Sequence, residues 1–224
     1  MDKTENLQTQ AYNLILSKIM RYEYVPGQKI SQKAIEGDLN MGRTPVREAL
    51  LRLKHVNLVD MQPQSGTFVT KIDYELVKNA LFIRENIESK IVTDVARQQT
   101  ISHIAAAEHA LEHQRIAAKS EDFQTFFEAD DIFHQSFYIE SGYGQIWDWL
   151  QTINPHLNRL RWLRLKVAKL PLDKFVEQHQ AIYNAVIAND AETANQLAIS
   201  HIHLMLGEQE IFKTFRNYFD NLPI

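Results

Sequence analysis

Residues 42–50 read Gly-Arg-Thr-Pro-Val-Arg-Glu-Ala-Leu, and they carry the strongest fold signal in the N-terminal part of the chain. Thr44 is a favourable N-cap residue. Pro45 then takes the first helical position, where its missing N–H group has no intrahelical partner to lose. Apolar residues follow at helical spacing, namely Val46, Leu50 and Leu53. The pattern predicts a helix that continues to about residue 55.

Two helices are predicted before this stretch and a β-hairpin after it. The elements are helices over residues 7–22 and 32–39 and strands over residues 58–62 and 67–70. Ser31 can cap the second helix, and Pro63-Gln64-Ser65-Gly66 supplies turn chemistry between the strands. Three short helices followed by a hairpin predict a winged helix-turn-helix domain, which we assign to residues 1–72.

The remaining residues, 73–224, read as helix, and we find no convincing strand from Tyr74 onward. Residues 71–73 form a short linker. Six helices are predicted, over residues 74–98, 101–118, 121–140, 144–166, 172–188 and 191–219. Short joints between long helices favour an antiparallel all-α bundle. The expected fold class is therefore mainly α, with a winged helix-turn-helix followed by this bundle.

Composition excludes several classes of protein. The chain has no cysteine, so it forms no disulfide and no thiolate metal site. No apolar run approaches the roughly 18 residues that span a bilayer. The polar N-terminus lacks the apolar segment of a signal peptide. We therefore expect a cytoplasmic protein that does not enter a membrane.

The charge is unevenly distributed along the chain, whose net charge is −4. Residues 1–72 contain 10 Lys and Arg against 7 Asp and Glu, and the remainder contains 14 against 21. A slightly basic N-terminal segment followed by an acidic remainder is compatible with a protein that contacts nucleic acid only through its N-terminal segment.

The predicted recognition helix carries the residues expected to contact DNA. Arg43 and Arg47 lie four residues apart, so both can project from the start of the helix, where an arginine can bind guanine through two hydrogen bonds. The first turn can also hold a phosphate. The candidate contact residues are Lys33, Arg43, Thr44, Pro45, Arg47 and Gly66. In isolation the two arginines would read as solvated surface charges, and the surrounding order of elements favours the DNA interpretation.

Four residues of the predicted bundle form a candidate metal site. Asp130 and His134 lie four residues apart and share a helix face. His179 precedes the predicted turn residue Asp190 by 11 positions and His201 follows it by 11, so an antiparallel hairpin places them level with each other. Three imidazoles and a carboxylate suit a divalent transition metal such as Zn, Ni or Mn. The alternatives are a surface His–Asp pair and a coincidental histidine spacing.

The N-terminal motifs resemble the GntR superfamily. The resemblance rests on Val25-Pro26-Gly27, on residues 42–50 and on Gly66-Thr67-Phe68-Val69. The family usually has Ser before the first arginine, where this chain has Gly42, so one phosphate contact is expected to be missing. The family's glycine after the recognition helix is replaced by Asn57, which also tolerates positive φ.

The C-terminal motifs resemble the FCD effector domain of FadR-type GntR regulators, over about residues 74–220. The resemblance implies that Asp130, His134, His179 and His201 are metal ligands. It also implies that Arg84 binds an effector carboxylate, the alternative being a helix pair with Glu88. Arg161 is a further candidate effector residue within a group of arginines that otherwise reads as a solvated face. Six helices favour the VanR-like branch.

These observations predict a homodimeric transcription repressor that binds operator DNA. The resemblance implies control by a small organic acid, such as a sugar acid, bound near the metal. One alternative is a constitutive DNA-binding regulator with a structural metal. Another is a metal-dependent hydrolase, for which Glu128 and Asp131 are badly spaced as general bases and the recognition-helix arginines have no role. We therefore do not expect an enzyme.

Overall fold

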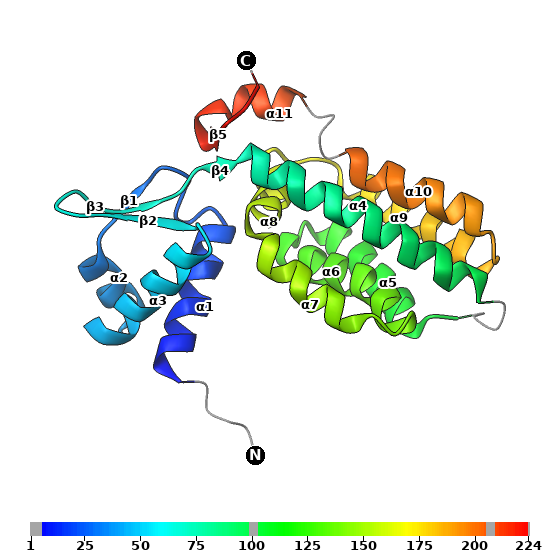
Figure 1. Cartoon of the computed structure of the whole chain (residues 1–224), viewed down its shortest axis with the longest axis horizontal. Coiled ribbons are helices and arrows are strands. Elements are labelled where there is room, and N and C mark those ends of the chain that lie inside the picture. The colour runs from blue at the N-terminus through cyan, green and yellow to red at the C-terminus, as the bar shows by residue number, and fades with distance from the viewer. Residues whose placement is uncertain (1–5, 99–102, 205–208, 224) are drawn as a thin grey trace. The chain divides into compact units, whose positions relative to one another are not determined.

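The structure of the chain, a computed structural model, describes residues 6–98, 103–204 and 209–223 (Figure 1). It confirms the mainly helical fold, with a winged helix-turn-helix at the N-terminal end and helices thereafter. Among the described residues, no helix combines the length and the apolar character needed to cross a membrane.

The winged helix-turn-helix consists of three helices and a small antiparallel sheet. Its elements are α1 (Leu7–Met20), β1 (Lys29–Ile30), α2 (Gln32–Leu39), α3 (Arg43–His55), β2 (Val59–Gln62) and β3 (Gly66–Val69). The predicted hairpin is present, and β1 adds a third strand on the other side of β3. β1 was not predicted, because two residues are too few to show a period of two. Ile15, Ile19, Leu50 and Leu53 form part of the fully buried core of these elements.

Two of the predicted turn and cap positions are confirmed, and two are wrong. Ser31 caps α2 by accepting a hydrogen bond from the Ala34 N–H, and Asn57 adopts φ 59° after α3. Thr44, however, does not cap α3, because the helix starts at Arg43 with Gly42 as its N-cap. For the same reason Pro45 is the third residue of the helix and not the first. Glycine is also favourable at an N-cap. Since it makes no side-chain cap hydrogen bond, the first-turn N–H groups stay available for another acceptor.

The C-terminal part is built of helices with short joints. They are α4 (Tyr74–Arg97), α5 (Ala105–Ser120), α6 (Phe123–Glu140), α7 (Gly144–Ile153), α8 (Pro155–Trp162), the π-helical turn η1 (Leu163–Val167), α9 (Leu172–Ile187), α10 (Ala191–His203), α11 (Gln209–Thr214) and a 3₁₀ turn (Arg216–Tyr218). α5 packs against α6 and α9, and α9 packs against α10. Phe133 and Phe137 of α6 and Val92 and Val95 of α4 belong to one apolar core.

The prediction of six helices is wrong for the described residues. The predicted helix over 144–166 is two helices, because Pro155 cannot donate the N–H that a continuous helix needs and instead opens α8. The predicted helix over 191–219 ends at His203, and α11 is a separate helix. Residues 101–102, the predicted start of another helix, lie outside the described residues. The helix count therefore does not favour the VanR-like branch.

The predictions of a linker at 71–73 and of no strand after residue 74 are also wrong. β4 (Ile72–Asp73) pairs in parallel with β5 (Phe219–Asp220). Both strands have two residues, which is too short to leave a periodic pattern in the sequence.

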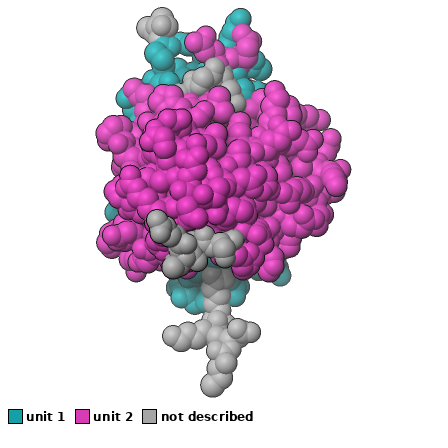
Figure 2. All heavy atoms as spheres, turned by 90° about the vertical axis from the view of Figure 1, so that its right-hand side faces the viewer, with its two compact units in different colours: residues 1–77, 155–163, 211–224 teal, residues 78–154, 164–210 magenta. Residues whose placement is uncertain are grey.

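The described chain divides into two compact units (Figure 2). The first comprises Met1–Val77, Pro155–Leu163 and Ile211–Ile224, and the second comprises Lys78–Asn154 and Arg164–Glu210. α8 and the C-terminal segment thus fold with the winged helix-turn-helix. The assignment of residues 1–72 and 73–224 to two domains remains a prediction.

Candidate metal centre and DNA-reading helix

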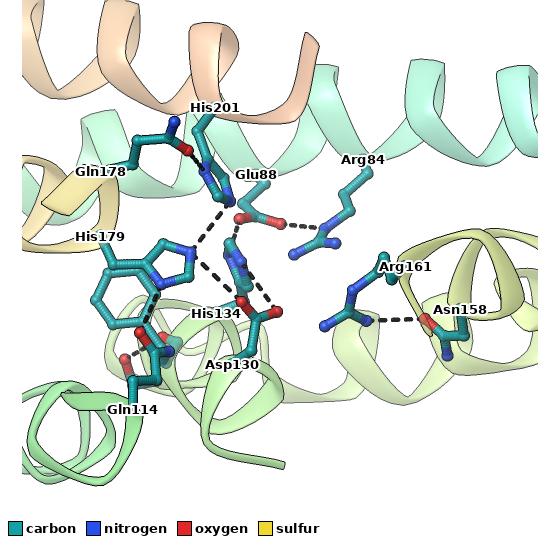
Figure 3. Close-up of polar contacts among 12 residues, drawn as sticks. Arg84, Glu88, Gln114, Asp130, His134, Asn158, Arg161, Gln178, His179 and His201 are labelled. Carbon is teal, nitrogen blue, oxygen red and sulfur yellow. Dashed lines mark hydrogen bonds and ion pairs between the residues drawn. The ribbon is translucent and has the colours of Figure 1, made fainter. Parts of the chain in front are cut away.

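Three helices of the second unit bring the predicted metal-binding residues together. α6 is packed along most of its length, so Asp130 and His134 turn inward and are buried. α9 supplies His179, which is fully buried, and α10 supplies His201. Asp190 caps α10 at the turn between these helices, which sets the two histidines level with each other. Figure 3 shows the four side chains converging.

The distances place all four groups around one point. The Nε2 atoms of His179 and His201 lie 3.1 Å apart. Asp130 Oδ1 lies 3.6 Å from Nε2 of His179, and its Oδ2 lies 3.7 Å from Nε2 of His134. The three histidines each offer one ring nitrogen, and these nitrogens lie within 4.8 Å of one another, so the group could hold a metal ion.

The opposite ring nitrogen of each histidine faces an oxygen acceptor. Nδ1 of His179 lies 2.8 Å from Oε1 of Gln114. Nδ1 of His201 lies 2.8 Å from Oε1 of Gln178. Nδ1 of His134 pairs with the carboxylate of Glu88. When Nδ1 carries the proton and donates it to the oxygen, Nε2 carries the lone pair that a metal ion needs.

A metal ion fits this donor set. Nε2 of His134 is buried and has no hydrogen-bond partner. The lone pairs of His179 and His201 would face each other at 3.1 Å without a proton between them. A buried polar atom without a partner costs free energy, and a cation at the common centre would supply one partner for all three imidazoles.

Burial keeps the imidazoles of His179 and His201 neutral. It lowers the pKa of His179 to about 3, although the Asp130 carboxylate acts in the opposite direction. Burial and the neighbouring imidazole of His179 also lower the pKa of His201 well below its ordinary value. Both side chains are therefore uncharged at neutral pH, which is the form that binds a metal.

A buried ion pair lies next to the histidines. Nε of Arg84 donates to Oε2 of Glu88 at 2.8 Å, so the helix pair considered from the sequence is formed. Burial acts to raise the pKa of Glu88, but the charges and hydrogen bonds of Arg84 and His134 outweigh it and hold the pKa below its ordinary range. The Nη2 atom of Arg84 is buried without a hydrogen-bond partner. One donor of this guanidinium thus remains for another acceptor.

Glu88, Gln114 and Gln178 were not predicted to support the histidines. Glu88 was visible only as a helix partner of Arg84, four residues earlier. The two glutamines carried no signal, because their contacts depend on how α5, α9 and α10 pack.

The arginines of the 159–164 segment are buried, so the prediction of a solvated face is wrong. Arg159, Arg161 and Arg164 are 0%, 6% and 4% exposed. Arg164 lies over the ring of Phe175 at 5.2 Å, and Nη1 of Arg161 donates to Asn158 Oδ1 at 2.8 Å. Leu157, Leu160 and Trp162 of α8 are buried as well, so this helix has little surface that faces solvent. The effector role of Arg161 remains a prediction.

The predicted DNA contacts lie on exposed parts of the first unit. Arg43, Thr44 and Arg47 are exposed on α3, and Lys33 is exposed on α2. Pro45 is half-buried in the first turn of α3. Gly66 is exposed at the start of β3 with φ 123°, and a Cβ there would lie 2.8 Å from Cε of Lys29. Glycine at this position therefore also leaves room for the Lys29 side chain.

The chain is similar to known families and proteins. The model of bacterial regulatory proteins of the gntR family matches residues 7–69, and the FCD domain model matches residues 79–204. The HTH-type transcriptional repressor RspR of Escherichia coli (strain K12) is 29% identical over 216 residues, which cover 96% of this chain and 92% of that protein. The HTH-type transcriptional repressor GlaR of the same organism is 26% identical over 204 residues, covering 85% and 90%.

Solved structures show the same fold. The structure of E. coli McbR/YncC matches with a TM-score of 0.75 and 20% identity, over 95% of this chain and all of that one. The named relatives are transcriptional regulators and not enzymes, so the hydrolase alternative is set aside. With both of its family segments matched, the chain belongs to the GntR family of bacterial transcriptional regulators, in the FadR-type group that joins an N-terminal helix-turn-helix to a C-terminal FCD domain.

Proposed function

We propose that this regulator is a repressor whose operator binding responds to a small organic acid held beside a divalent metal ion. The observation that supports it best is the pairing of two incomplete groups in one buried place. Three imidazole Nε2 atoms converge with Asp130, and the neighbouring Arg84 keeps a buried Nη2 without a partner. A metal ion and a carboxylate would complete both.

The proposed metal ligands are Asp130, His134, His179 and His201. Zn, Ni and Mn all accept imidazole and carboxylate ligands. When bound, the metal would act as a Lewis acid that attracts a carboxylate oxygen of the effector. A metal that prefers six ligands keeps positions open beyond these four protein groups, so Ni or Mn suits a sensor better than tetrahedral Zn does.

Arg84 is the proposed partner of the effector's negative charge. Its guanidinium is fixed by Glu88 on one side, and a guanidinium can offer further N–H donors to a carboxylate. Arg161 is proposed as a second effector residue on the strength of the family resemblance. A sugar acid, which combines a carboxylate with hydroxyl groups, is the proposed class of effector.

The proposed operator contacts are Lys33, Arg43, Thr44, Pro45, Arg47 and Gly66. Arg43 and Arg47 are exposed at the start of α3, where a recognition helix meets base edges. The uncapped first turn that Pro45 helps to fix offers N–H groups to a phosphate. Because operator DNA lies in the cytoplasm of a bacterial cell, we also propose a cytoplasmic location for the protein.

A homodimer is proposed because two recognition helices related by a two-fold axis would match a pseudo-palindromic operator. Sedimentation of the full chain tests this point, and a monomeric mass in the presence of operator would contradict it.

The central experiment is a thermal-shift screen of small organic acids, with and without a chelator. We expect one class of hydroxy acid to raise the melting temperature only when metal is present. The same acid should change the affinity for an operator selected from random duplex DNA. Stabilisation that is equal in chelator would contradict the metal-assisted mode of binding.

A constitutive regulator with a structural metal is the second candidate. The observation in its favour is that three buried imidazoles and Asp130 already provide four protein ligands, which complete a tetrahedral zinc shell. This candidate predicts that the chelator lowers the melting temperature while no acid in the screen changes operator affinity.

A further inference from the structure

Two side chains of α8 hold the backbone that follows the last strand of the wing. Nη2 of Arg159 donates to the carbonyl oxygen of Thr70 at 2.6 Å, and its Nη1 donates to that of Lys71 at 3.3 Å. One turn earlier on α8, Nδ1 of His156 accepts the N–H of Asp73 at 2.9 Å. Residues 70–73 are thus bound through their backbone, and the sequence of that segment need not encode the contact.

Arg159 is an unusual residue for this place. Its side chain is fully buried, and no carboxylate among the described residues forms an ion pair with it. Burial lowers its pKa to about 10, with the charge interaction of Tyr22 acting in the opposite direction. A buried cation without a counter-ion is costly, and an apolar side chain would fill the same space at lower cost. An apolar side chain, however, cannot donate hydrogen bonds to two successive carbonyl groups and so cannot hold their orientation.

α8 and residues 70–73 are each held by a further contact within the first unit. The hydroxyl of Tyr22, just after α1, donates to the carbonyl oxygen of Arg159 at 2.7 Å. On the other side β5 pairs with β4, and Asn221 donates to the Asp73 carboxylate at 3.2 Å. The end of the wing, the end of α1 and the C-terminal segment therefore all meet α8 or the strand beside it (labels in Figure 1).

We propose that Arg159 is the positioning residue that sets the orientation of the winged helix-turn-helix for operator binding. α8 belongs to the FCD segment of the sequence, whereas residues 70–73 follow directly on the gntR segment. On both sides of α8 the chain continues into the second unit, at Asn154 and at Arg164. A displacement of α8 would therefore move the DNA-binding elements through the Arg159 contacts. The proposal requires DNA binding but not the proposed effector.

The test uses the full chain. Because the chain has no cysteine of its own, a pair of introduced cysteines can be labelled without labelling any other residue. Fluorophores at Gln64→Cys on the wing and Lys119→Cys on α5 report the distance between the two units in single molecules, with labelled chains diluted into unlabelled ones. Arg159→Gln should broaden the distance distribution and weaken operator binding about tenfold, the loss expected for hydrogen bonds from a charged group. Arg159→Lys should recover part of both, because an ammonium reaches one carbonyl.

The matched control is Arg97→Gln, which removes the charge of an exposed arginine and should leave both readouts at the wild-type level. A purely structural role of Arg159 would lower the melting temperature while the distance distribution and the operator affinity at 25 °C stay unchanged, and that result would overturn the proposal. If Arg159→Gln does not fold, Tyr22→Phe takes its place, since it removes only the hydroxyl that binds the Arg159 carbonyl. We expect it to weaken operator binding about threefold, and wild-type behaviour of this variant would overturn the proposal equally.

Discussion

The exposed basic face of α2 and α3 and the buried polar centre of the FCD domain use charged and polar residues in opposite ways. Lys33, Arg43 and Arg47 extend into solvent, where each can meet DNA independently and where salt screens each of them. Glu88 and His134 are shielded from solvent, and each is held by the other. Contacts at a surface site therefore contribute separately, whereas the loss of one group in a buried site weakens the whole site.

The largest effect should follow from His179→Ala. The substitution removes one Nε2 from the centre and leaves His201 without its nearest neighbour. We expect the metal content to fall from about one ion per chain to near zero, and the melting temperature to lose its response to chelator. Elemental analysis and thermal melting measure this. His109→Ala, at an exposed position on α5, is the control. Equal metal content in the two variants would refute the ligand role.

Arg47→Ala tests the exposed basic face of α2 and α3. Because Arg47 is exposed, its loss should leave the melting temperature within about 1 °C of the wild type and weaken operator binding roughly 10- to 100-fold. Titration of the selected operator at physiological salt measures the affinity, and Arg97→Ala serves as the control. Unchanged affinity would remove Arg47 from the DNA contact.

Glu88→Gln tests whether a residue next to the proposed ligands contributes to metal binding in the buried centre. Glu88 is not one of the proposed metal ligands, yet it holds Nδ1 of His134 and pairs with Arg84. We expect metal affinity to fall about 10- to 100-fold, as for other partners of metal-bound histidines. Competition with a chelator of known affinity measures it, with Glu140→Gln as the exposed control. If the variant keeps the metal affinity of the wild type, Glu88 pairs with Arg84 but does not contribute to metal binding.

Lys33→Ala should have the smallest effect. A single phosphate contact made by an exposed lysine weakens binding to all sequences alike and reduces the slope of log affinity against log salt by about 1. Operator and unrelated duplex DNA are titrated at several salt concentrations, with Lys119→Ala as the control. A loss confined to the operator would instead assign Lys33 to base recognition.

Local sequence signals predicted most of the winged helix-turn-helix. Ser31 as a helix cap, Asn57 at positive φ and the hairpin all depend on residues close together in the chain. The errors lie where local signals compete or are too short. Gly42 capped α3 in place of Thr44, and the two-residue strands β1, β4 and β5 left no periodic pattern.

Residue types and their spacing were enough to predict that Asp130 lies beside His134 and that His179 lies level with His201. Helix periodicity is a local property, so such pairs can be predicted from residue numbers alone. The contacts of Glu88, Gln114 and Gln178 with the histidines, and those of Arg159 with the backbone after the wing, follow from the tertiary structure alone. These contacts join residues 23 to 89 positions apart. Their geometry is set by how whole helices pack, which no local pattern of residues records.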